Sequence, residues 1–152
     1  MAEIPPWIAV VDDDPAVLKG LRRLLRSRGF RVQTFESGRD FLAALPHGLP
    51  ECLIVDLQMP GMSGWDLQQH LARNDIPIPT IMITAHGEAA LRGRHEQAGL
   101  VAFLLKPLQE NSLFAAINKA IGASPGSRYE RDRLRKNPAA AGQVGFRIDG
   151  SC

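Results

Sequence analysis

The sequence predicts an α/β domain built on a parallel sheet with helices on both faces. Short apolar runs of strand length alternate five times with segments of helical periodicity, the pattern of successive β-α units. Right-handed crossovers between parallel strands place the helices on the two faces of the sheet. With 152 residues, 45% of them hydrophobic, the chain can bury a core, and its length suits one domain with a short appendage.

The first predicted unit spans residues 7–29. Residues 7–11 are a short apolar run, which suits a strand covered on both faces, and the run stops at three aspartates. The helix that follows has basic residues on one face and an apolar stripe on the other: Val17, Leu18, Leu21, Leu24 and Leu25. Asp14 suits the N-cap of this helix, Pro15 its first turn, and Gly29 the position just past its end.

The same alternation predicts the remaining elements. Further strands are expected at residues 31–35, 52–57, 78–84 and 101–105. Further helices are expected from Ser37 to Leu45 and over residues 65–72, 85–97 and 110–121. Residues 46–51 and the "MPGMSG" segment are expected to be loops.

Polar residues stand where the predicted strands end. Parallel α/β sheets bind ligands at the carboxyl ends of their strands. The strand ends carry carboxylates, one hydroxyl and one ammonium: Asp12, Asp13, Asp14, Asp56, Thr84 and Lys106. We expect these groups to converge on one edge of the sheet.

This set of groups predicts a cation site beside a nucleophile. Carboxylates this close raise one another's pKa unless a cation neutralises them. Hard oxygen ligands suit Mg²⁺, which usually binds one or two carboxylates together with a phosphate oxygen. A carboxylate can become an aspartyl phosphate, and a metal ion and a lysine stabilise the charge of a phosphoryl group in transfer.

The motifs "VVDDDP", "LIVDLQMPGMSG", "IMITAHG" and "AFLLKP" carry a family resemblance. In their order and spacing, over residues 7–122, the chain resembles a response-regulator receiver domain of two-component signalling. The wording of "MPGMSG" and "ITAHG" is nearest to the nitrogen-fixation and LuxR-type branch. The resemblance implies a flavodoxin-like (βα)5 doubly wound parallel sheet with strand order 2-1-3-4-5. The composition becomes linker-like after Gly122, so we expect a receiver domain over residues 1–122 and a basic, mostly disordered tail over residues 123–152.

The resemblance further implies a role for each matching residue. Asp56 matches the phosphoacceptor. Asp12 and Asp13 match the acidic pair that holds Mg²⁺, with Asp13 favoured as the direct ligand.

The resemblance also gives roles to five other residues. The backbone carbonyl of Gln58 matches the third protein ligand of the metal, and Thr84 matches the hydroxyl that bonds the phosphoryl oxygen. Lys106 matches the lysine of the family pattern, Pro107 the cis-proline that follows it, and Phe103 the switch aromatic that turns inward.

Plainer interpretations stand beside several of these roles. Asp14 is expected to be a helix cap rather than a metal ligand. Phe103 also suits an ordinary core aromatic. Asp56 alone could be a structural acid, although an unpaired buried one is costly. Thr84 and Lys106, each taken alone, suit a plain hydroxyl and a solvated lysine at a strand end.

The resemblance implies a sensor histidine kinase or a phosphotransfer protein as partner. It also implies an output face made by the fourth helix, the fifth strand and the fifth helix. Ala102 and Leu105 stand on this face where related chains often carry acids, and such an apolar surface favours a homodimer or another partner. Gly93 lowers the stability of the fourth helix by about 1 kcal/mol relative to alanine.

The tail keeps a second function open. Residues 123–152 hold few large apolar residues but six Lys and Arg, which suit nonspecific, salt-dependent affinity for DNA. A transcription regulator is therefore the alternative, although no base-reading motif favours DNA as a partner. A small-molecule phosphatase of the phospho-aspartyl type is disfavoured, because those enzymes place the nucleophile after the first strand.

The remaining observations concern compartment. No apolar run approaches the ~20 residues of a membrane span, and the N-terminus does not resemble a signal peptide. The two cysteines, Cys52 and Cys152, lack metal-ligand spacing and are expected to be reduced thiols. We therefore expect a cytoplasmic protein with no membrane partner.

Overall fold

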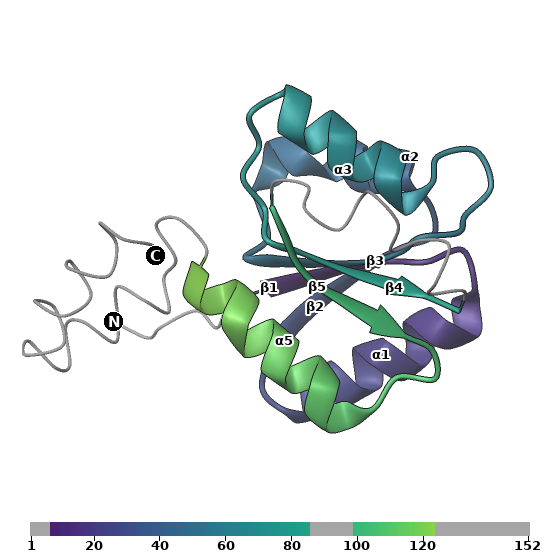
Figure 1. Cartoon of the computed structure of the whole chain (residues 1–152), viewed down its shortest axis with the longest axis vertical. Coiled ribbons are helices and arrows are strands. Elements are labelled where there is room, and N and C mark those ends of the chain that lie inside the picture. The colour runs from purple at the N-terminus through teal and green to yellow at the C-terminus, as the bar shows by residue number, and fades with distance from the viewer. Residues whose placement is uncertain (1–6, 86–98, 124–152) are drawn as a thin grey trace, which may run out of the picture.

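The computed structural model describes residues 7–85 and 99–123. Within these ranges the chain forms one sheet of parallel strands in the order β2-β1-β3-β4-β5, which confirms the predicted fold (Figure 1). The strands lie close to the predicted ranges: β1 Trp7–Val11, β2 Arg31–Phe35, β3 Cys52–Asp56, β4 Thr80–Thr84 and β5 Leu100–Leu105.

Helices cover both faces of the sheet. They are α1 Pro15–Ser27, α2 Gly38–Ala44, α3 Gly64–Arg73 and α5 Glu110–Ala123. Helices α1 and α5 lie on one face, and α2 and α3 lie on the other (Figure 1). The helix expected over residues 85–97 lies almost wholly outside the described residues, and so do His86, Arg92, Gly93, Arg94 and the tail beyond Ala123.

Side-chain caps fix where the helices begin. The carboxylate of Asp14 accepts a hydrogen bond of 2.9 Å from the backbone N–H of Ala16, which confirms the predicted cap of α1. At α3, Ser63 and Asp66 form a reciprocal capping box. This cap sets the first turn of α3 directly after the loop that leaves β3.

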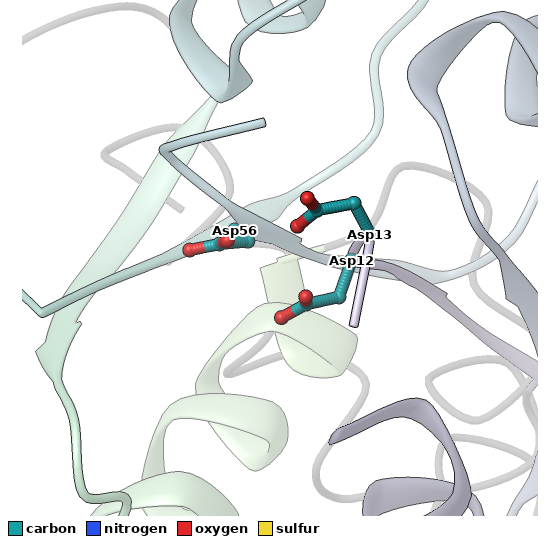
Figure 2. A group of neighbouring side chains, drawn as sticks. All are labelled: Asp12, Asp13 and Asp56. Atoms are coloured by element: carbon teal, nitrogen blue, oxygen red, sulfur yellow. The ribbon is translucent and has the colours of Figure 1, made fainter. Parts of the chain in front are cut away.

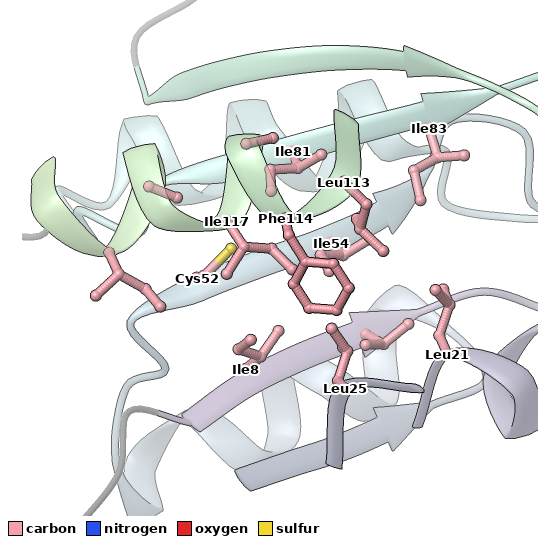
Figure 3. Packing of buried hydrophobic residues seen from close by; sticks show 14 of the residues in the cluster. Ile8, Leu21, Leu25, Cys52, Ile54, Ile81, Ile83, Leu113, Phe114 and Ile117 are labelled. Atoms are coloured by element: carbon pink, nitrogen blue, oxygen red, sulfur yellow. The ribbon is translucent and has the colours of Figure 1, made fainter. Parts of the chain in front are cut away.

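Each face of the sheet buries its own apolar cluster. The cluster beneath α1 and α5 includes residues from three strands, among them Ile8, Ile54 and Ile81 (Figure 3). The cluster beneath α2 and α3 includes Trp65 and Met82, and Phe103 packs against it. The central strands β3 and β4 are buried along their whole length, so the polar residues at their ends are held by a rigid core.

Several boundaries differ from the predicted ones by one or two residues, and two of the differences involve prolines. Strand β4 begins at Thr80 rather than Ile78, because Pro77 and Pro79 lack the N–H groups that a ladder requires. Residues Leu45–His47 form a short 3-10 helix rather than a plain loop. Pro46 can occupy this first turn because it needs no hydrogen bond there. None of the helices in the described ranges is long and apolar enough to cross a membrane.

Candidate functional site

The carboxyl ends of β1 and β3 bring three carboxylates together. Asp12 and Asp13 directly follow β1, and Asp56 is the last residue of β3 (Figure 2). Asp12, Asp13 and Asp56 each offer an oxygen, and these three oxygens all lie within 4.8 Å of one another. Asp12 and Asp56 are buried, whereas Asp13 is exposed. The predicted convergence of these acids on one edge of the sheet is therefore present.

Lys106 reaches the same cluster from the end of β5. Its ammonium nitrogen lies 3.5 Å from Oδ2 of Asp12 and 3.6 Å from Oδ1 of Asp56. The lysine side chain is 29% exposed, while those of Asp12 and Asp56 are 3% and 8% exposed. One partly exposed cation thus faces two buried carboxylates. The cluster keeps an excess of negative charge.

Backbone hydrogen bonds set these positions. The N–H of Lys106 donates to the carbonyl of Thr84 at 2.8 Å, which extends the pairing of β4 and β5 by one residue. The N–H of Asp12 donates to the carbonyl of Phe35 at 3.1 Å and extends the pairing of β1 and β2. The polar residues are therefore held by the ladders of the sheet, which end at this edge.

Burial raises the pKa of both inner carboxyls. For Asp12, desolvation is opposed by the backbone N–H of Asp14, which donates to Oδ1 at 2.9 Å, and by Lys106. For Asp56, desolvation and the charge of Asp12 raise the pKa, while Lys106 and the backbone N–H of Gln58 lower it. A second cation in the cluster would relieve both carboxylates.

Thr84 and Gln58 belong to the two segments next to Asp56, the end of β4 and the loop after β3. Thr84 is the last residue of β4, and its side chain is fully buried. Gln58 is exposed in the loop after β3, two residues beyond Asp56. The N–H of the intervening Leu57 donates to the carbonyl of Ile83 at 2.7 Å, so β3 and β4 stay paired up to the site.

The two remaining predicted positions lie on and after β5. The peptide bond between Lys106 and Pro107 is cis. Phe103 is partly buried, and its ring centroid lies 5.9 Å from that of Trp65 on α3. Leu105, next to Lys106, is 56% exposed and places an apolar side chain on the outer edge of the sheet.

Sequence reasoning missed two residues beside the site, Gly64 and Trp65. A Cβ atom at position 64 would lie 2.9 Å from the backbone oxygen of Asp56 and 2.9 Å from Cα of Leu57. Only glycine permits this approach of α3 to the end of β3. The second glycine of "MPGMSG" was the available signal, but it suits a turn equally well.

The donor set fits a hard divalent cation. Three carboxylate oxygens within 4.8 Å of one another are the kind of ligand that Mg²⁺ takes, and Mg²⁺ completes its shell with water. Two of the three donors are buried at strand ends, and their charge is only partly balanced by Lys106. The cluster can therefore bind a metal ion.

Fold and site together define a class of protein. A (βα)5 sheet with an acidic cluster and a lysine at its carboxyl edge is the arrangement expected for a receiver domain. Residues 8–118 match the family described as "Response regulator receiver domain". The chain belongs to this family, and the resemblance of its motifs to two-component receivers is confirmed.

Curated relatives agree with this assignment. The response regulator protein TmoT of Ectopseudomonas mendocina is 42% identical over 133 residues, which are 88% of this chain and 60% of TmoT. The transcriptional regulatory protein FixJ of Bradyrhizobium diazoefficiens is 37% identical over 124 residues, which are 81% of this chain and 60% of FixJ. The chain thus spans about 60% of the length of these relatives.

Solved structures show the same fold. The crystal structure of FixJ-N matches with a TM-score of 0.69 and 36% identity, and the match covers 79% of this chain and 94% of that one. The response regulator StyR matches with a TM-score of 0.72 and 40% identity, covering 96% of this chain and 72% of that one.

Proposed function

We propose that the chain is a phosphorylation-switched signalling module that accepts a phosphoryl group on Asp56. The observation that carries this proposal is the position of Lys106, whose ammonium lies within 3.6 Å of both Asp12 and Asp56. A cation beside a buried carboxylate at a strand end is suited to receive and hold a phosphoryl group. We also propose residues 1–122 as the receiver domain and residues 123–152 as a separate tail.

The proposed reaction is transfer from a phosphohistidine of a sensor kinase or a phosphotransfer protein. A carboxylate oxygen of Asp56 forms the new bond to phosphorus while the bond from phosphorus to the histidine nitrogen breaks. The electron pair of that bond leaves with the imidazole, which is then protonated. Lys106 faces the developing charge on the phosphoryl oxygens. Thr84 is proposed to donate a hydrogen bond from its hydroxyl to one of these oxygens.

We assign the metal site to Asp12, Asp13 and Asp56, with the backbone carbonyl of Gln58 as a further ligand. Bound Mg²⁺ would neutralise the carboxylates and the phosphoryl oxygens during transfer. Asp13 is exposed, so its side chain can adjust to the ion, whereas Asp12 is fixed by its bonds to Asp14 and Lys106. We therefore propose that metal binding depends most on the side chain of Asp13.

The outward signal is proposed to pass through the face that contains β5 and α5. The 56% exposed Leu105 lies on this face beside Lys106 and offers an apolar contact. When Asp56 is phosphorylated, Phe103 is proposed to turn inward and change this surface, which then binds a partner or a second copy of the chain. A measurement of oligomeric state with and without phosphorylation tests this step, and an unchanged state in both conditions counts against a homodimer.

The proposed phosphoacceptor is tested by incubation with Mg²⁺ and acetyl phosphate followed by intact mass. We expect the wild type and Asp75→Asn, a change in an exposed turn, to gain one phosphate. We expect Asp56→Asn to gain none, and a chelator to prevent the gain in the wild type. Absence of an adduct on the wild type, or an equal adduct on Asp56→Asn, contradicts the proposal.

Transcription regulation is the second candidate function. It is favoured by the similarity to FixJ, a transcriptional regulatory protein of which this chain covers 60%. A DNA titration at two salt concentrations, with the full chain and with residues 1–122, tests direct binding by the tail. Salt-dependent binding that requires residues 123–152 supports this function, and equal binding by both chains contradicts it.

A further inference from the structure

A buried tryptophan supports the aromatic residue of β5. The ring of Trp65, on the first turn of α3, lies 5.9 Å from the ring of Phe103, and their planes meet at 41°. Trp65 is only 8% exposed, whereas Phe103 is partly buried. Aromatic pairs at this separation attract one another beyond their burial of area. Trp65 is thus a fixed surface on which the more exposed Phe103 rests.

The same turn of α3 contacts the end of β3. The N–H of Gly64 donates to the carbonyl of Leu57 at 2.9 Å. A Cβ atom at position 64 would lie 2.9 Å from the backbone oxygen of Asp56 and 2.6 Å from Sδ of Met82. Met82 pairs in register with Phe103 across β4 and β5. Gly64, the residue before Trp65, is therefore packed against the backbone of Asp56 and against the side chain of Met82.

We propose that Trp65 is a positioning residue that couples the position of Phe103 to the state of Asp56 through the first turn of α3. The inference rests on the proposed function, because it takes Asp56 as the phosphoacceptor and Phe103 as the switch aromatic. The proposal takes the inward turn of Phe103 to move its ring away from Trp65, which lies 5.9 Å from it in this structure. The contact with Trp65 therefore opposes the turn and favours the partly exposed position of Phe103.

Coupling of this kind is reciprocal. If phosphorylation of Asp56 changes the contact between Phe103 and Trp65, removal of the contact changes the affinity of the Asp56 site by the same factor. The worth of one aromatic pair corresponds to about a 2- to 10-fold change in an equilibrium constant. We therefore expect Trp65→Leu to bind beryllofluoride, a mimic of the acyl phosphate, about 2- to 10-fold more tightly in the presence of Mg²⁺.

A spectroscopic experiment tests the contact directly. The chain has two tryptophans, so Trp7→Phe leaves Trp65 as the single emitter. This variant is treated with acetyl phosphate and Mg²⁺, and intact mass and fluorescence are recorded on the same sample. We expect a change in Trp65 emission that grows with the phosphorylated fraction and is lost when Phe103→Leu is added.

The outcomes separate the inference from the proposed function. If no phosphate is added, the proposed function fails. If phosphate is added but Trp65 emission is unchanged, or changes equally with Phe103→Leu, the coupling through the ring pair is wrong and the proposed function stands. The mass measurement therefore decides which of the two claims has failed.

A double-mutant cycle provides the quantitative test. Beryllofluoride affinity is measured for the wild type, Trp65→Leu, Phe103→Leu and the double variant. We expect Trp65→Leu to change the affinity much less when Phe103 is already leucine, since the pair is then already broken. Equal effects in both backgrounds, or weaker binding by Trp65→Leu, overturn the proposal. Urea unfolding verifies that each variant is folded, and should Trp65→Leu not fold, the fluorescence experiment on Trp7→Phe decides.

Discussion

The ammonium nitrogen of Lys106, which directly follows β5, lies 3.6 Å from a carboxylate oxygen of Asp56, the last residue of β3. The same nitrogen lies 3.5 Å from Asp12, so one lysine side chain bridges two buried acids. This bridge connects Asp12, a proposed metal ligand, to Asp56, the proposed phosphoacceptor.

Removal of the Lys106 charge is expected to slow phosphorylation of Asp56. In Lys106→Gln the ammonium is lost, and the phosphoryl group in transfer loses a cation that faces it. Loss of one such electrostatic contact reduces a rate by about 10²- to 10³-fold. The rate of adduct formation from acetyl phosphate at fixed Mg²⁺ measures the effect. Lys119→Gln, which removes an exposed lysine of α5, is the matched control, and a rate equal to that control contradicts the role of Lys106.

Asp13 and Asp14 are neighbours, but we expect Asp13→Asn to weaken Mg²⁺ binding and Asp14→Ala to weaken only the cap of α1. Asp13→Asn should lose most of the stabilisation by Mg²⁺, which for the wild type is about 2.7 kcal/mol at a concentration 100 times the Kd. Asp14→Ala should keep this increment, because the N–H of residue 14 still bonds to Asp12, but should start about 1 kcal/mol less stable without its cap. Urea unfolding with and without Mg²⁺ separates the two effects. If both variants lose the stabilisation by Mg²⁺, the assignment of Asp13 as a metal ligand and Asp14 as a helix cap only is wrong.

The raised pKa of Asp56 predicts how stability depends on pH without divalent cations. The carboxyl of Asp56 holds its proton more tightly in the folded state than in the unfolded chain, where its pKa has the ordinary value of 3.8. The stability that the protonated carboxyl contributes is therefore full below about pH 3.8 and is lost as the pH rises through the raised, folded pKa.

In Asp56→Asn, residue 56 no longer ionises, so the protein does not lose stability at this position as the pH rises. We expect this substitution to raise the free energy of unfolding near pH 7 by an amount on the order of 1 kcal/mol, because it reduces the excess of buried negative charge. The gain should shrink towards pH 4. Urea midpoints measured across this range in a chelating buffer test the difference, with Asp75→Asn as the exposed control. A gain that does not vary with pH is incompatible with titration of Asp56.

Close contact at Gly64 predicts a large effect of a single methyl group. In Gly64→Ala the new carbon would meet backbone atoms of Asp56 and Leu57, which cannot move aside as a side chain can. We expect a loss of about 1–3 kcal/mol in the free energy of unfolding. Gly20→Ala is the control, because position 20 of α1 has nothing within 4 Å and alanine there should add about 0.5–1 kcal/mol. Similar urea midpoints for the two variants would contradict this packing.

The sheet and the polar edge were predictable because both depend on local patterns. Short apolar runs marked β1 to β5, and the residues that end them had to share one edge once the strands were parallel. Asp12, Asp56 and Lys106 therefore came together without any knowledge of distances. Asp14 was recognised as a cap because it stands directly before Pro15 and an amphipathic helix.

Packing across elements was not predictable. The approach of Gly64 to Asp56 and the contact of Trp65 with Phe103 depend on how α3 lies over the sheet, and no local pattern reports that geometry. The charge of Asp12 was expected to raise the pKa of Asp56, but burial, which raises it most, is a property of the assembled edge. The start of β4 at Thr80 follows from two prolines whose effect was underestimated.

The most direct test of the central claim is to locate the phosphoryl group. The chain is incubated with acetyl phosphate and Mg²⁺, then treated with borohydride, which reduces an aspartyl phosphate to homoserine. Fragment mass spectrometry of the peptides that contain residues 12–14 and 52–59 reports which aspartate has changed. We expect homoserine at position 56, dependent on Mg²⁺ and absent from Lys106→Gln at short times. Reduction at Asp12 or Asp13, or at no aspartate, would contradict the assignment of Asp56 as the phosphoacceptor.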